Sequence, residues 1–320
     1  MNRTTSSIPH PTDRMRSTDR RTFLGYFWYH RGLYLLLLPA LLYYFTFHYL
    51  PYLGATIAFK DFNIMKGIFG SPWVGLKHFR ALFVLDQFWR VVRNTLEISV
   101  LRLFFGFPVP LIVALLMNEV GRNGFKRVVQ TMVYLPHFIS WVILGGILIN
   151  LLSTQTGVVN MVIRSLTGNP IGFLTDPAYF RGTLIWSMIW KEFGWGTVLY
   201  MATLAGIPAE LYESAAMDGA GRFRRMFSIT LPYLLPVIVV LLILRVGNLM
   251  QAGFEQIFVL YHPGVYRVSD ILDTYVYRLG LADGRFSMAS AVGLFRSVIN
   301  LTLLVLANKF ARMTGQQGIY

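Results

Sequence analysis

Long stretches without an ionisable side chain divide this sequence into six apolar segments. Residues 32–59 and 128–163 contain no Asp, Glu, Lys or Arg, and each remaining segment contains two at most. A helix needs about 20 apolar residues to cross the hydrocarbon core of a bilayer. The pattern therefore predicts an all-α integral membrane protein of about six transmembrane helices, with spans near 32–52, 94–118, 129–152, 182–206, 230–254 and 287–310.

The predicted spans contain prolines and charges that an isolated apolar helix would avoid. Pro108 and Pro110 are expected to kink the second span, because each lacks the N–H that the helical hydrogen-bond ladder needs. Charged side chains inside a span are energetically expensive, so by default they face the bundle interior or a water-filled path. Such side chains occur in the fourth, fifth and sixth spans: Lys191, Glu192, Arg245 and Arg296.

The amino-acid composition is also that of a chain that lies largely in a membrane. Hydrophobic residues make up 55% of the 320 residues and charged residues only 14%, whereas a soluble domain carries roughly 25% charge. The net charge of +14 could suggest a nucleic-acid partner, but in a chain this apolar it indicates Lys and Arg beside anionic headgroups, so no nucleic acid is expected. The absence of cysteine excludes disulfides, thiolate metal ligands and a thiol nucleophile.

The distribution of Lys and Arg orients the chain. The terminal segments and the turns 119–127 and 207–228 hold 14 of them, against 11 in the longer opposite loops 53–93, 153–181 and 255–286. Positive charge marks the cytoplasmic side, so both termini are predicted to be cytoplasmic. The first span lacks a small-residue cleavage site and is interpreted as an anchor. Residues 1–24 are polar and basic, and we expect a disordered tail there.

Residues 207–228 form a cytoplasmic segment with its own helical pattern. Pro208 can occupy the first turn of a helix, where Glu210 and Glu213 favour the positive end of the dipole. Gly219 and Gly221 should break this helix, and a second short helix should then lead to the membrane. An amphipathic helix lying on lipid headgroups is the alternative interpretation.

The same segment carries a family motif. Glu213, Ala215 and Gly219 are followed, nine residues later, by Ile-x-Leu-Pro at 229–232, with Ser214 where an alanine is usual. The motif resembles the signature loop of permease subunits of ATP-binding-cassette (ABC) importers. The similarity covers about residues 25–320 and extends to YLPHFISWV (134–142) and FEQIFVLYHPGVY (254–266), which resemble the carbohydrate branch of that family, the one that handles oligo- and polysaccharides.

This resemblance implies a coupling helix that docks into a cytoplasmic ATPase. The implied partners are a second permease subunit, two ATPase subunits, an extracytoplasmic solute-binding protein and a saccharide, in a bacterial cytoplasmic membrane. ATP and Mg would be bound by the partner, since the nearest run to a phosphate loop has Leu76 in place of its lysine; this chain is expected to hold no cofactor or metal and to be no enzyme. The implied coupling residues are Glu213, Ser214, Ala215, Ala216, Asp218, Gly219 and Arg222.

Two helix faces are candidates for the solute path, and one of them, on the helix before the segment 207–228, is formed by Met188, Glu192, Trp195 and Leu199. At 100° per residue, Arg245, Asn248, Gln251 and Glu255 fall within about a 120° arc of one helix. Sugars offer C–H faces to aromatic rings and hydroxyls to amides and guanidinium groups. Ion pairs between Lys191 and Glu192 or between Arg245 and Glu255, serving structure alone, remain open. With what the resemblance implies, the predicted path residues are Met188, Lys191, Glu192, Trp195, Arg245, Asn248, Leu249 and Arg296.

Cations outnumber acids along this predicted path, which favours an anionic solute such as a uronic-acid oligosaccharide, for example alginate; neutral glycosides remain open. The aromatic outer loop 255–286 is a candidate contact for the binding protein or a gate. Two other function classes are considered. An ion-coupled secondary transporter would usually show duplicated halves and broken helices. A membrane-embedded glycan enzyme would need clustered acids, and Asp270 and Asp273 form the only close acidic pair in that loop.

Overall fold

The structure, a computed structural model, describes residues 28–313 and 315, and none of these forms a β-strand. By its internal contacts the chain separates into two units, Met1–Gly54 and Ala55–Tyr320. The first contains α2 (Arg31–Tyr44), which continues as the π-helical η2 (Phe45–Tyr49) into η3 (Leu50–Phe59). Apolar side chains cover α2 and none of them is buried, as expected for a helix whose solvent is lipid. The predicted disordered tail lies outside the described residues.

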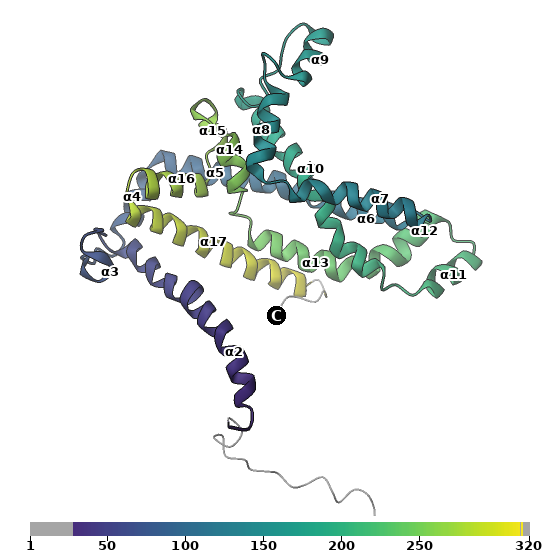
Figure 1. The fold of residues 1–320 in the computed structure, drawn as a ribbon, viewed down its shortest axis with the longest axis horizontal. Helices are drawn as coiled ribbons and strands as arrows, with labels where there is room; N and C mark the ends of the chain where they lie inside the picture. The colour runs from purple at the N-terminus through teal and green to yellow at the C-terminus, as the bar shows by residue number, and fades with distance from the viewer. Residues whose placement is uncertain (1–27, 314, 316–320) are drawn as a thin grey trace, which may run out of the picture. The chain divides into compact units, whose positions relative to one another are not determined.

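The second unit is a bundle of helices (Figure 1). Its elements, in chain order, are α3 (Gly67–Gly70), α4 (Lys77–Val84), α5 (Asp86–Leu101), η4 (Arg102–Gly106), α6 (Pro108–Asn118), α7 (Asn123–Tyr134), η5 (Leu135–Phe138), α8 (Trp141–Leu152), α9 (Val158–Thr167), α10 (Pro177–Leu204), α11 (Ala209–Met217), α12 (Arg222–Arg225), η6 (Met226–Thr230), α13 (Leu231–Gly247), α14 (Phe254–Leu260), η7 (Pro263–Val265), α15 (Tyr266–Ser269), α16 (Leu272–Tyr277), η8 (Arg278–Ala282) and α17 (Phe286–Met313).

Four helices among the described residues are long and apolar enough to cross a membrane: Arg31–Phe59, Asp86–Asn118, Arg222–Gly247 and Phe286–Met313. They coincide with the first, second, fifth and sixth predicted spans. A fifth forms if Gly124–Phe138 and Trp141–Leu152 are counted as one broken span. The fourth predicted span corresponds to α10, whose 28 residues are long enough but too polar to be identified by composition. The chain is an all-α, multi-pass membrane protein.

Two of the predicted spans are irregular inside the membrane region. In the second span, the π-helical turn η4 comes directly before the prolines, and Pro108 lies in the first turn of α6. A π-helical turn accommodates an extra residue without ending the helix. The third, predicted near 129–152, is broken in the structure. It bends by 95° at Ile139, whose backbone is extended, and Ser140 then caps α8 by accepting a hydrogen bond from the Ile143 N–H at 3.3 Å.

The predicted boundaries around the fifth span are corrected at both ends. The span was expected to run to residue 254, but α13 ends at Gly247 and the chain turns before α14 begins at Phe254. The short helix expected before it is not separate, because α12, η6 and α13 form one helix, Arg222–Gly247. Residues 245–255 therefore belong to a helix end, a turn and a new helix rather than to one helical face.

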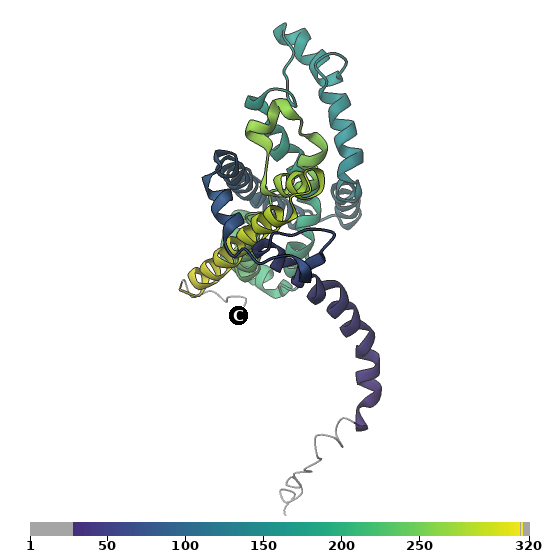
Figure 2. The same cartoon turned by 90° about the vertical axis from the view of Figure 1, so that its left-hand side faces the viewer.

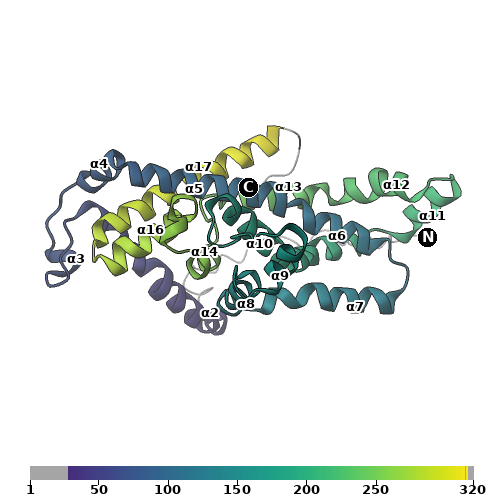
Figure 3. The ribbon, with the colours of Figure 1, turned by 90° about the horizontal axis from the view of Figure 1, so that it is seen from above.

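Three buried apolar clusters hold the second unit together. One lies among α4, α5, α16 and α17, a second among α5, α8, α10 and α14, and a third among α6, α10 and α13. Helices α13 and α17 run side by side, and α11 lies beside α12 at the end of the unit away from α4 and α16 (Figures 1–3). The clusters share α5 and α10, so these two helices form the frame around which the others pack.

Candidate transport cavity

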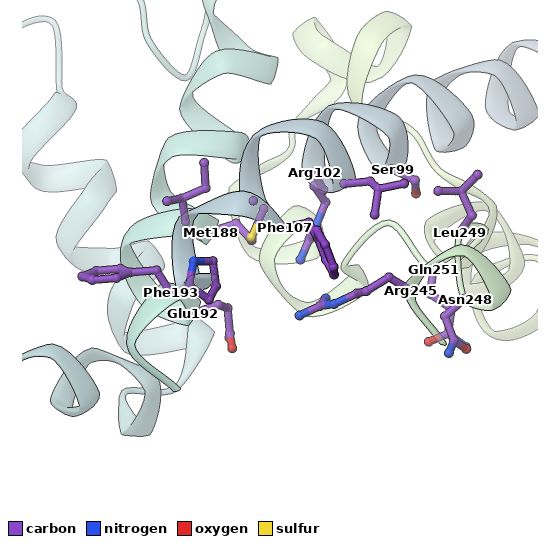
Figure 4. A pocket seen from close by; sticks show the side chains of 14 residues that line it. Ser99, Arg102, Phe107, Met188, Glu192, Phe193, Arg245, Asn248, Leu249 and Gln251 are labelled. Atoms are coloured by element: carbon purple, nitrogen blue, oxygen red, sulfur yellow. The ribbon is translucent and has the colours of Figure 1, made fainter. Parts of the chain in front are cut away.

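A cavity opens where α5, η4, α10 and the end of α13 meet (Figure 4). Its volume is about 740 Å³, including its open mouth. Each wall comes from a helix that bears polar residues among apolar ones, as a solute path through a membrane requires. The lining residues are Ser99, Arg102, Leu103, Gly106, Phe107, Pro110, Met188, Ile189, Glu192, Phe193, Arg245, Asn248, Leu249 and Gln251.

Arg102 is held in this wall by hydrogen bonds to the chain that follows α13. Its Nη1 donates to the carbonyl oxygen of Ala252 at 2.7 Å and to Oε1 of Gln256 at 3.2 Å. Gln256 is buried and donates in turn to the Leu184 carbonyl and the Ser187 hydroxyl. The network joins η4, α14 and α10, so the guanidinium has a fixed position at the cavity.

Gly253 makes this arrangement possible. Its φ is +90°, a left-handed conformation that other residues rarely adopt, and a Cβ built there would lie 1.9 Å from Arg102 Nη1. The guanidinium therefore occupies the space of a missing side chain. Gly253 is also the residue directly before α14. It therefore ends the turn and leaves the space that the Arg102 guanidinium occupies.

The charge balance inside the cavity is positive. Arg102 and Arg245 face the cavity space in Figure 4, against Glu192 as the lining acid. Arg245 is exposed and forms no hydrogen bond or ion pair with the described residues, so the pair with Glu255 that the sequence left open does not form. Ser99 has the only buried side-chain oxygen without a hydrogen-bond partner among the described residues. A free guanidinium and a free hydroxyl suit a solute that carries carboxylate and hydroxyl groups.

Five of the eight predicted path residues line the cavity: Met188, Glu192, Arg245, Asn248 and Leu249. Lys191, Trp195 and Arg296 do not. Lys191 is buried and donates from Nζ to the His137 carbonyl at 2.6 Å. Trp195 stacks on the His137 ring, with centroids 4.7 Å apart. Arg296 forms an ion pair with Asp273 on α16.

A charged cluster lies behind the cavity at the bend before α8. His137 Nδ1 is 3.0 Å from Glu192 Oε2, and Lys191 Nζ is 3.5 Å from Glu192 Oε1. The interpretation of Lys191 and Glu192 as an ion pair is therefore correct, while Glu192 also reaches the cavity. The cluster fixes the only lining carboxylate to the bent third span.

Sequence reasoning missed Arg102, Ser99 and Phe107 as lining residues. Arg102 lies within the second predicted span, but its face cannot be chosen from the sequence because η4 changes the helical phase. The signal was the Pro108–Pro110 pair, since a π-helical turn at functional sites commonly precedes such an interruption.

The segment predicted to couple to an ATPase projects from the bundle as α11. Of the seven predicted residues, six are exposed and Ala215 is half-buried. Gly219 has φ +74° and ends α11 with hydrogen bonds from Gly219 N–H to the Ala216 carbonyl and from Ala220 N–H to the Ala215 carbonyl, which is the Schellman arrangement. Gly221 has an ordinary φ of −67°, so the predicted break depends on Gly219.

A single hydroxyl pair fastens α11 to the bundle. The Tyr212 hydroxyl lies 2.9 Å from Thr230 Oγ1, and its ring packs against the cluster that contains Leu204 and Leu234. Helix α11 therefore contacts both α10 and the base of α13, and the middle of α10 and the other end of α13 line the cavity.

The segment 255–286, predicted to be an outer loop, is folded rather than extended, and Asp270 and Asp273 within it form ion pairs. Asp270 is buried and accepts two hydrogen bonds from Arg278, while Asp273 pairs with Arg296. Burial raises the pKa of Tyr261 and of Tyr275. The two carboxylates expected for a glycan enzyme therefore serve structural ion pairs. On α5, Arg93 and Glu97 also form an ion pair, with Arg93 Nε 2.6 Å from Glu97 Oε1.

The chain belongs to the family of binding-protein-dependent transport system inner membrane components, whose pattern matches residues 106–315. Two relatives come from Bacillus subtilis (strain 168). Protein LplB is 48% identical over 290 residues, 91% of each chain. The polygalacturonan/rhamnogalacturonan transport system permease protein YteP is 46% identical over 288 residues, 90% of each chain.

A solved structure has the same fold over nearly the whole chain. The crystal structure of a bacterial alginate ABC transporter in complex with an alginate pentasaccharide-bound periplasmic protein contains a chain 41% identical in sequence, with a TM-score of 0.86 over 93% of this chain and 99% of that one. The predicted family is therefore confirmed, and the chain is a membrane transport subunit rather than an enzyme. Broken helices, which were expected of an ion-coupled secondary transporter, occur in this chain too. Family membership therefore distinguishes this chain from a secondary transporter.

Proposed function

We propose that this chain is the permease subunit of an ATP-driven, binding-protein-dependent importer of acidic oligo- or polysaccharides. The observation that carries the proposal is the cavity wall in which Arg102 and Arg245 face one carboxylate, Glu192. Guanidinium groups bind carboxylates through paired, charge-assisted hydrogen bonds. Ser99, Asn248 and Gln251 add neutral groups that can bind sugar hydroxyls.

The names of the relatives support an acidic saccharide. YteP is named for polygalacturonan and rhamnogalacturonan, and a second solved structure, 42% identical with a TM-score of 0.85, is described as an ABC transporter that imports the acidic polysaccharide alginate. A more distant relative, 29% identical, is the trehalose/maltose permease MalF of Thermococcus litoralis. The guanidinium pair favours the acidic class for this chain, with alginate as one member.

The same proposal assigns the parts of a complete importer. A second, related permease subunit would close the path, two ATPase subunits would bind ATP and Mg, and a binding protein would deliver solute to the extracytoplasmic side. Both termini and α11 would be cytoplasmic, and Glu213, Ser214, Asp218 and Arg222 would contact the ATPase. The exposure of these side chains and the anchoring of Tyr212 support this assignment.

Reconstitution of the complete complex in proteoliposomes tests the acidic solute. Arg245→Gln should raise KM for a uronic-acid oligosaccharide by about tenfold or more, since a hydrogen bond to a charged group contributes about 1.5–3 kcal/mol, and should leave a neutral oligosaccharide unaffected. Arg164→Gln, a cation outside the cavity, is the control. Equal wild-type uptake of a neutral maltodextrin and an acidic oligosaccharide would refute the acidic preference.

The coupling role is tested in the same vesicles with neighbouring glycines. Gly219→Pro removes both the left-handed residue and its hydrogen bond to Ala216, so stimulation of the ATPase by loaded binding protein should be lost. Gly221→Ala should be normal, because its φ is ordinary and no atom lies within 4 Å of the added Cβ. Normal stimulation in Gly219→Pro would show that another segment contacts the ATPase.

A further inference from the structure

Five aromatic side chains form a continuous series next to the cavity. Phe254 and Phe258 lie on α14, Tyr261 follows it, Tyr266 begins α15 and Tyr277 ends α16. Centroid distances are 5.1 Å from Phe254 to Phe258, 5.9 Å from Phe258 to Tyr261 and 4.9 Å from Tyr261 to Tyr266. Tyr277 lies 4.7 Å from Phe258. We call these five residues the aromatic ladder.

The ladder lies at the edge of the packed core, where Tyr261 packs against the second apolar cluster. None of its members is buried, and Tyr277 is 37% exposed. By contrast, the neighbouring Tyr275 is 3% exposed and belongs to an apolar cluster. Phe254 and Tyr277, with Phe286, line a second cavity of about 880 Å³ including its open side. At Phe254 and Tyr277 the ladder therefore presents ring surface to an open space.

One end of the ladder, Phe254, lies next in sequence to the turn that holds Arg102 in the wall of the transport cavity. Phe254 directly follows Gly253, the residue against which the Arg102 guanidinium packs. The other end lies in the segment 255–286 that the proposed orientation places outside the membrane. There the Arg278 guanidinium stands 5.0 Å from the centroid of Tyr266. The series of rings thus runs from a cation in the outer segment to a cation at the cavity.

We infer that the aromatic ladder is a saccharide-binding track, on which successive sugar rings of an acidic oligosaccharide stack between the outer face and the cavity; this inference rests on the proposed function. A pyranose ring has an apolar C–H face that packs on an aromatic face, while its hydroxyls stay in water or bind a tyrosine hydroxyl. Several similar rings in a row bind a chain at many registers. Such a surface retains a long saccharide without fixing it at one site.

The inference predicts a dependence on saccharide length. In the reconstituted complex, Phe258→Leu and Tyr261→Leu keep apolar volume but remove ring surface. Each should raise KM for a pentameric uronic-acid oligosaccharide by about tenfold, the order expected for a lost aromatic contact with its buried area, and for the dimer by no more than about twofold. Tyr261→Phe keeps the ring and should behave as wild type. Tyr179→Leu removes a similarly exposed tyrosine of α10 outside the ladder and is the control.

The outcomes separate this inference from the proposed function. Wild-type complex that transports no acidic saccharide of any length refutes the proposed function. Wild-type transport with equal effects of Tyr261→Leu on dimer and pentamer refutes the track alone. A defect in Tyr261→Phe as large as in Tyr261→Leu also refutes it, because the hydroxyl would then act rather than the ring. Loss of binding-protein-stimulated ATPase in the leucine variants at saturating saccharide would assign the ladder to docking instead.

Discussion

Gly253 offers the most direct test of how the cavity is built. In Gly253→Ala the new Cβ would lie 1.9 Å from Arg102 Nη1 and 2.8 Å from its Cζ, closer than any non-bonded contact allows. The guanidinium must then leave the Ala252 carbonyl and Gln256. We expect the substitution to move Arg102 out of the wall rather than merely to strain the backbone.

The magnitude has two parts. A non-glycine residue at φ +90° costs roughly 1–2 kcal/mol. Loss of a hydrogen bond from a charged donor costs about 1.5–3 kcal/mol more, so the free energy of unfolding should fall by about 3–5 kcal/mol in total. Gly284→Ala is the control for the first part, because Gly284 has φ +66° and no atom lies within 4 Å of an added Cβ.

A double-mutant cycle isolates the contact. In an Arg102→Ala background the added methyl group meets no guanidinium, so Gly253→Ala should cost only the backbone part, and the coupling energy should be about 1.5–3 kcal/mol. Thermal unfolding of the purified complex and initial rates of saccharide uptake are the two readouts. Additive effects of the two substitutions would refute the reasoning, because they would mean that Arg102 does not occupy this space.

Two further substitutions test other parts of the unit. The side chain of Asn160 is buried and forms hydrogen bonds with backbone groups of Leu152, Ser153 and Ile171. Asn160→Ala should lower the midpoint of thermal unfolding by several degrees, because each buried carbonyl left unpaired costs about 1–3 kcal/mol. Asn150→Ala, at an exposed position, is the control and should leave the midpoint unchanged. Tyr212→Phe removes the contact with Thr230 and should increase ATP hydrolysed per saccharide imported; an unchanged ratio would exclude Tyr212 as the link between α11 and α13.

The hydrophobic pattern alone predicted most of the spans, because a helix that crosses lipid needs apolar side chains along its whole length. It could not predict where those helices break. Ile139 is extended and Gly253 is left-handed, yet both lie in apolar sequence that is equally compatible with a helix. These breaks are determined by tertiary hydrogen bonds, such as the one from Arg102 to Ala252, which local sequence does not reveal.

The path residues show the same limit. Met188 and Glu192 lie on the regular helix α10, so helical spacing predicted both correctly as lining residues. Trp195 shares that spacing but stacks on His137, which comes from another element, and does not line the cavity. Arg296 was chosen for its charge, and only the fold shows that Asp273 neutralises it. Spacing identifies a face of a helix, whereas its neighbours decide whether the face is open.

Irregular backbone and the cavity occur together for a physical reason. A helix whose hydrogen bonds are complete presents only side chains to its surroundings, whereas a break exposes carbonyl and N–H groups that need partners and is tolerated in a membrane protein only beside protein or water. Three such breaks lie near the cavity: η4, the bend at η5 and the turn after α13. Arg102 of η4 and Gln251 of the turn line the cavity, and His137 at the bend contacts the lining residue Glu192. Because each break joins segments that can rotate about it, a force on α11 that moves α10 against α13 would change the separation of Glu192 and Arg245. In the proposed importer, the broken helices would thus supply Arg102 and Gln251 to the cavity and the mobility that alternating access requires.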